Sequence, residues 1–95
     1  RVILERRAGV EHLKIVIAAD KPMSAPGLIV EALSPFAFGL PEFVVDGRQT
    51  IASISVRGGK QKISLGGQRV ILTIYDGSTG IERSVIVGNP KIAGD

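Results

Sequence analysis

The sequence contains no cysteine and no tryptophan, and its 95 residues include one histidine, one tyrosine and three phenylalanines. Without cysteine the chain can form neither disulfides nor thiolate metal sites. The single histidine, His12, does not make a zinc site without other strong ligands. Because aromatic residues are so scarce, we expect valine, isoleucine and leucine to fill the core.

Recognisable catalytic motifs are also absent. His12 is the only conventional general base, and no serine lies in the strand–turn–helix setting of an activated nucleophile. The pairs Gly58-Gly59 and Gly66-Gly67 precede strand-like sequence, whereas a phosphate-binding loop opens a helix. We therefore predict no catalytic, cofactor-binding or metal-binding residues, and no enzyme activity of the chain on its own.

The charge balance is mildly basic, with a formal net charge of +3. A basic patch is predicted from four residues that lie close in the sequence, namely Arg57, Lys60, Lys62 and Arg69. Such a patch can follow a phosphate backbone, but single-strand binding sites combine positive charge with aromatic stacking platforms. No aromatic residue accompanies these four, so nucleic acid is not the favoured partner.

Length and composition indicate a single domain over residues 1–95. A hydrophobic fraction of 44% excludes a disordered tail. No apolar run approaches the roughly 20 residues that a membrane-spanning helix needs. Because the sequence begins at Arg1 and both ends look like continuing sequence, we expect a domain excised from a longer chain.

Alternating polar and apolar residues predict strands in the C-terminal half. Residues 69–76 and 82–87 are separated by the turn formers of residues 76–80, and together they read as a β-hairpin. Residues 50–56 alternate cleanly. Residues 61–65 read as a short strand between two glycine turns, with Ile63 and Leu65 facing inward.

The N-terminal half is less uniform. Residues 1–7 and 11–19 suit two strands joined at residues 8–10. Prolines interrupt residues 21–41, so that residues 27–33 fit a strand or, alternatively, a short helix capped near Ser24. The β-branched pair Ile29 and Val30 favours the strand.

The predicted fold is all-β: an antiparallel β-sandwich, immunoglobulin-like in the loose sense of about seven short strands. The alternative is an α+β fold with one short helix near residues 25–33.

Every phenylalanine falls within residues 33–43, a segment stiffened by prolines. Rings exposed there would form a partner-binding loop at low entropic cost, and the predicted contact residues are Phe36, Phe38, Leu40 and Phe43. Alternatively, the rings pack into the core where the chain crosses over the sheet.

Three functions remain open. The favoured one is a non-catalytic interaction or scaffolding module that binds a protein partner or neighbouring domain through residues 33–43 or a sheet edge. The second is a domain that binds a carbohydrate or other small ligand near Tyr75, Glu82 and Arg83. The third is an accessory domain of an enzyme. A periplasmic or extracellular location is preferred.

Overall fold

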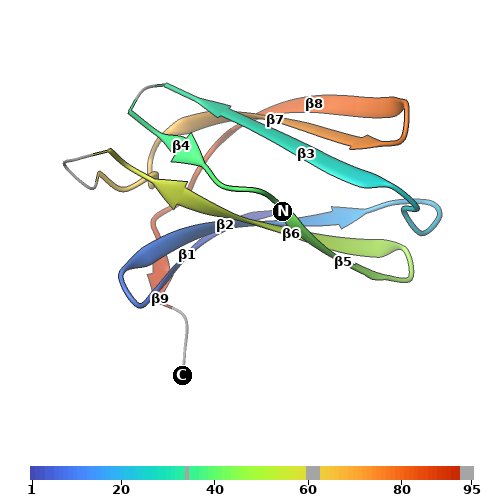
Figure 1. Cartoon of the computed structure of the whole chain (residues 1–95), viewed down its shortest axis with the longest axis horizontal. Helices are drawn as coiled ribbons and strands as arrows, with labels where there is room; N and C mark the ends of the chain where they lie inside the picture. Colours follow the sequence, from blue (N-terminus) through green and yellow to red (C-terminus); the bar gives the residue numbers. More distant parts are fainter. Residues whose placement is uncertain (34, 60–62, 93–95) are drawn as a thin grey trace.

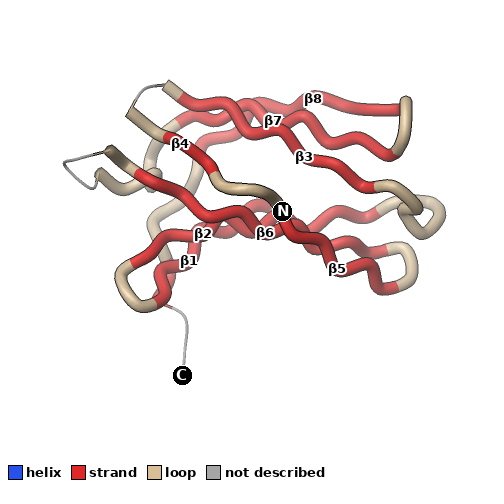
Figure 2. The backbone as a smooth tube through the Cα atoms, in the orientation of Figure 1, coloured by secondary structure: helices blue, strands red, loops and turns tan. Residues whose placement is uncertain are grey.

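The computed structural model describes residues 1–33, 35–59 and 63–92, which form two packed β-sheets (Figure 1). Figure 2 shows only strands and loops in these ranges, with no helix. The nine strands are β1 (Val2–Arg7), β2 (Val10–Ala18), β3 (Pro26–Ala32), β4 (Ala37–Phe38), β5 (Glu42–Asp46), β6 (Gln49–Arg57), β7 (Arg69–Asp76), β8 (Thr79–Ile86) and β9 (Lys91–Ile92).

The two sheets differ in size. The large sheet has the order β4-β6-β2-β1-β9, with β5 also paired to β6, and the small sheet has the order β3-β7-β8. All neighbours are antiparallel except β1 and β9. The prediction of an antiparallel β-sandwich is therefore confirmed. The immunoglobulin-like comparison, which rests on the number and length of the strands, stays a prediction.

The core lies between the sheets and is aliphatic. Alternate residues of β2 and β6 point inward, and Leu13 and Ala52 are completely buried. From the small sheet, Val70 and Leu72 meet them with at most 2% of their surface exposed. This pattern confirms that valine, isoleucine and leucine carry most of the burial, as the scarcity of aromatic residues requires.

Two-residue turns close three of the hairpins. Ala8 and Gly9, with φ of 51° and 78°, join β1 to β2, while Gly47 (φ 59°) and Gly77 (φ 63°) each open another turn. Positive φ at these positions matches the mirror-image turns that suit the twist of a hairpin. The β7–β8 turn is tighter than predicted, because Thr79 already pairs with Asp76.

The structure decides the stretch that the sequence left open. Residues Pro26–Ala32 form β3, which pairs along its whole length with β7, so the alternative of a short helix is wrong. Gly27 makes room for the ring of Tyr75 on the neighbouring strand, because a Cβ atom at Gly27 would clash with Tyr75 Cζ. The ring thus covers the gap that a glycine leaves in a strand.

The predicted short strand over residues 61–65 is wrong for residues 63–65, which the structure describes. Residues 63–65 belong to the connection between β6 and β7, which passes from the large sheet to the small one. Leu65 is completely buried as expected, whereas Ile63 is 41% exposed. Residues 61 and 62 lie outside the described ranges.

The Ala8–Gly9 turn yields a stability prediction. Alanine rarely adopts positive φ, whereas asparagine tolerates it, and Asn-Gly is the preferred pair in this type of turn. We expect Ala8→Asn to raise the free energy of unfolding by about 0.5–1 kcal/mol in urea denaturation. Ala8→Val is the control and should lower it, because a β-branched side chain is strained there. A loss of stability in Ala8→Asn would contradict the assigned turn.

Candidate functional site

The three phenylalanines of residues 33–43 lie against the core. Phe36, Phe38 and Phe43 are each partly buried and pack on the central hydrophobic cluster. Leu40, the fourth predicted contact residue, is 91% exposed. Of these four predicted partner-binding residues, only Leu40 therefore presents most of its side chain to solvent.

A bulge explains the exposure of Leu40. β4 and β5 both pair with β6, but the register shifts between them: Phe38 lies opposite Val56, and Glu42 lies opposite Ser53. One extra residue is accommodated between these pairs, and Pro41 lies within the interruption. Bulges and prolines at sheet edges hinder the addition of another strand. The part of the chain that contains β4, Pro41 and β5 is therefore a protected edge of the large sheet.

The predicted basic patch is divided between the sheets. Arg57 ends β6 in the large sheet, and Arg69 begins β7 in the small sheet. The Arg69 guanidinium donates a hydrogen bond to Ser84 Oγ at 3.1 Å. Lys60 and Lys62 lie outside the described residues.

His12 lies on the outer face of the large sheet. It is opposite Glu5 on β1 and Ser55 on β6, in a shallow polar hollow that also includes Lys14. Lys14 Nζ forms an ion pair with Glu5 Oε1 at 3.2 Å. Glu31 and Glu82 lie on strands of the other sheet, away from His12. Within the described ranges, no three potential ligands gather to hold a metal ion.

Sequence reasoning missed the role of Glu11, whose side chain is 10% exposed. Its carboxylate accepts hydrogen bonds from Ser64 Oγ (2.6 Å), the Leu65 N–H (2.9 Å) and Arg6 Nη2 (2.9 Å). Burial raises the pKa of this carboxyl, but the hydrogen bonds and the positive charge of Arg6 outweigh that effect and lower the pKa below its ordinary value of 4.5. Glu11 therefore fastens the connection between the sheets to β2.

The edges of the two sheets differ in how well they are protected. The β4–β5 edge has the bulge and Pro41, β1 is partly covered by β9, and β3 begins with Pro26. β8 has neither proline nor bulge, and its eight residues pair in unbroken register with β7. On its other side, no strand of the described chain pairs with it. β8 is therefore the least protected edge.

Hydrogen bonding to β7 shows which backbone groups of β8 face outward. The Val87 N–H donates to the Gln68 carbonyl at 2.8 Å, one step beyond the Arg69–Ile86 pair. Because bonded and non-bonded pairs alternate in an antiparallel ladder, the odd-numbered residues of β8 bond to β7. The N–H and C=O groups that point to the free edge belong to Gly80, Glu82, Ser84 and Ile86.

The side chains of β8 form two chemically distinct rows. Glu82 lies on the outer face, opposite Thr73, and Arg83 lies on the inner face, opposite the buried Leu72. Arg83 Nη1 donates a hydrogen bond to the Glu82 carbonyl at 3.1 Å, an acceptor at the free edge. Tyr75 and Glu82 lie on the outer face and Arg83 on the inner face, so the three residues considered for a sugar site do not converge on one face.

The strand pattern identified most of β8, but sequence alone could not show that it forms an edge. The available signal was the absence of proline from residues 79–87, in a chain with five prolines. That signal indicates a strand able to form hydrogen bonds on both sides, although it does not reveal which side is empty.

The Glu11 contacts predict the effect of removing its charge. Glu11→Gln keeps the shape of the side chain but weakens its charge-assisted hydrogen bonds, so we expect a loss of about 1–3 kcal/mol in unfolding free energy at pH 7. Glu42→Gln, at an exposed position of β5, should change the stability by less than about 0.5 kcal/mol.

The pH dependence follows from the direction of the pKa shift. The pKa of Glu11 is lower in the folded than in the unfolded chain, so its stabilisation is present above about pH 4.5 and lost as the pH falls through the folded pKa. Thermal unfolding of the unmodified protein and of the Glu11→Gln variant from pH 7 to pH 3 should show their stabilities converging. A constant difference would contradict a charged Glu11.

Comparisons with known proteins complete the description. No helix of the described residues is long and apolar enough to cross a membrane. No curated protein matches the chain. In fold, the chain is similar to a solved structure, the N-terminal periplasmic domain of ScsB from Proteus mirabilis, with a TM-score of 0.71 and 13% sequence identity. The match covers 94% of this chain but 36% of the ScsB chain.

At such low identity, the ScsB likeness supports the fold alone. A family match, by contrast, extends over residues 4–90, and thus over most of the sequence. The chain therefore belongs to the family described as a domain of unknown function, DUF8393.

Proposed function

We propose that this domain is a non-catalytic protein-interaction module that binds an extended segment of a partner protein by strand addition to β8. The observation that carries the proposal is the free edge of β8, whose outward backbone groups are not paired with another described strand. Strand addition would satisfy these groups with main-chain hydrogen bonds, which supply affinity, while side chains on the two faces supply specificity.

Charge favours a different protein over a second copy of this chain. When two β8 strands pair antiparallel, residues opposite each other share a face. The outward backbone groups belong to even-numbered residues, so two β8 strands can form hydrogen bonds only when even-numbered residues lie opposite one another. Of the two registers that meet this condition with the greatest overlap, one places Glu82 against Glu82 and the other places Arg83 against Arg83. Like charges directly opposite one another are destabilising. A segment with a basic residue opposite Glu82 and an acidic residue opposite Arg83 avoids both conflicts.

The setting of this interaction is also a proposal. The ScsB domain is periplasmic, and we extend a periplasmic or extracellular location to this chain on the likeness of fold. Roles as a scaffolding domain, a small-ligand or carbohydrate-binding domain, or an accessory domain of an enzyme remain predictions. No observation favours them as specifically as the β8 edge favours strand addition.

Hydrogen exchange followed by NMR tests the free edge and its occupation. In the isolated domain, the amides of Glu82 and Ser84 should exchange faster than those of Arg83 and Val85, which are bonded to β7. A binding peptide selected from a library of random ten-residue sequences should protect Glu82 and Ser84. Protection confined to the region of Leu40, or unchanged exchange throughout β8, would refute strand addition at this edge.

A matched pair of proline variants separates binding from folding. Ser84→Pro removes an N–H from the free edge, so the fold should persist while the selected peptide binds at least about tenfold more weakly. Val85→Pro removes an N–H that is bonded to β7 and should destabilise the domain. If the folded Ser84→Pro variant bound the peptide with unchanged affinity, the edge would not be the binding site.

A further inference from the structure

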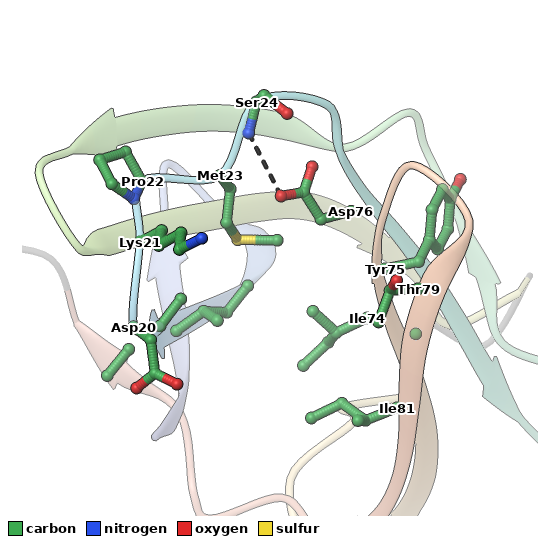
Figure 3. Close-up of a pocket in the computed structure, with 14 residues that line it drawn as sticks. Asp20, Lys21, Pro22, Met23, Ser24, Ile74, Tyr75, Asp76, Thr79 and Ile81 are labelled. Atoms are coloured by element: carbon green, nitrogen blue, oxygen red, sulfur yellow. Dashed lines mark hydrogen bonds between the residues drawn. The ribbon is translucent and has the colours of Figure 1, made fainter.

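An open cleft lies at the end of the sandwich, beside the β7–β8 turn (Figure 3). Its volume is about 550 Å³. Apolar side chains line it from both sheets and from the loop between β2 and β3, and they are Ile17, Met23, Ile74 and Ile81. Asp20 and Lys21 contribute polar groups from the same loop, and Figure 3 shows Ile74 and Ile81 facing toward it.

The β2–β3 loop is held in place at one end of this cleft. Asp76, which ends β7, accepts hydrogen bonds from the Ala25 N–H (2.7 Å) and the Ser24 N–H (3.3 Å) through its carboxylate oxygens. Met23, directly before these residues, is 9% exposed. The wall opposite Ile81 is therefore anchored to the same hairpin that contains Ile81.

The cleft adjoins the free edge of β8. Ile81 points to the inner face of the small sheet, as does its partner Ile74, yet it remains 50% exposed. Side chains of a further strand would flank Ile81 within the sheet, but β8 is the last strand of the small sheet in the described chain. A side chain placed beside Ile81 by an added strand would thus enter the cleft.

We infer that the cleft is the specificity pocket for one apolar side chain of the strand that adds to β8. This inference rests on the proposed function and names the chemistry of its partner. Ile81 and Arg83 lie two residues apart on the inner face, with Glu82 between them on the outer face. The partner residue opposite Ile81 should be apolar. The one opposite Arg83 should be acidic, and the one opposite Glu82 should be basic.

The order of these partner residues follows from strand direction. The small sheet is antiparallel throughout, so an antiparallel addition continues it. The residue opposite Arg83 then precedes the residue opposite Ile81 in the partner sequence. The recognised motif reads acidic–basic–apolar from its N-terminus. Its acidic residue would pair with the Arg83 guanidinium as the incoming strand displaces that group from the Glu82 carbonyl.

Three synthetic peptides test the pocket and the pairing separately. Each has ten residues with the same alternating threonine and valine flanks, and the centres are Glu-Lys-Leu, Glu-Lys-Ser and Lys-Glu-Leu. Binding to the domain is measured by calorimetry. We expect the Glu-Lys-Leu peptide to bind roughly tenfold or more tightly than the Glu-Lys-Ser peptide, because leucine buries apolar surface in the cleft. The Lys-Glu-Leu peptide should bind more weakly, because it places like charges opposite Glu82 and Arg83.

Two variants locate the effect on the domain. Ile81→Glu should remove the preference for leucine over serine, whereas Ile86→Glu, the same change at a 64% exposed position on the outer face, should preserve it. Both positions are substantially exposed, and an unchanged amide NMR spectrum away from β8 would verify the fold.

The outcomes distinguish the two proposals. Equal binding of the leucine and serine peptides, with both weakened by Ser84→Pro, would overturn the pocket while leaving strand addition intact. Peptide binding that is insensitive to Ser84→Pro would overturn strand addition itself. A leucine preference that survives Ile81→Glu would place the apolar contact elsewhere and also refute the pocket.

Discussion

The burial of aliphatic side chains between two sheets of unequal size is the constraint on which the rest of the structure depends. Leu13 and Ala52 of the large sheet and Leu72 of the small sheet are almost completely removed from water. Each buried aliphatic side chain contributes on the order of 1.5–3 kcal/mol relative to an exposed one. Since the small sheet has only three described strands, its last strand, β8, extends to the boundary of this core.

The difference in size between the two sheets connects the core to the candidate binding edge. On the inner face of the small sheet, Leu72 on β7 is 2% exposed, whereas Ile81 on β8 is 50% exposed. The same boundary leaves the outward amides of β8 without a described partner strand and opens the cleft beside Ile81. Edge, charge pattern and cleft thus share one structural origin.

Polar contacts secure the connections that the core alone would leave loose. Glu11 fastens the connection from β6 to β7, and Asp76 fastens the loop from β2 to β3. Both carboxylates accept backbone N–H groups, which are expensive to leave without a partner when they are buried. Each contact spans more than 50 residues of sequence, so these two connections are held by long-range hydrogen bonds as well as by apolar packing.

Protection of the other edges makes the β8 edge more distinctive. The bulge that turns Leu40 outward, Pro41 beside it and Pro26 at the start of β3 all hinder further strand pairing. The aromatic segment that composition had made conspicuous therefore packs its rings on the core and shields an edge. On β8, Glu82 and Arg83 discourage pairing between identical copies while leaving the backbone available to a complementary strand.

The amino-acid sequence by itself determined most of the long strands and the hairpin turns, because side-chain alternation and the backbone freedom of glycine are local properties. Residues 50–56 and 69–76 were readable as strands for this reason, and the turn at Gly77 was marked by its Asp-Gly pair. Residues 63–65 were misread as part of a strand, because the backbone of Leu65 is held by a hydrogen bond to Glu11, which lies far away in the sequence. Only the tertiary structure decided that β8 became an edge, that Ile81 stayed partly exposed and that Glu11 binds the connection from β6 to β7. These features depend on contacts between segments that no local pattern connects.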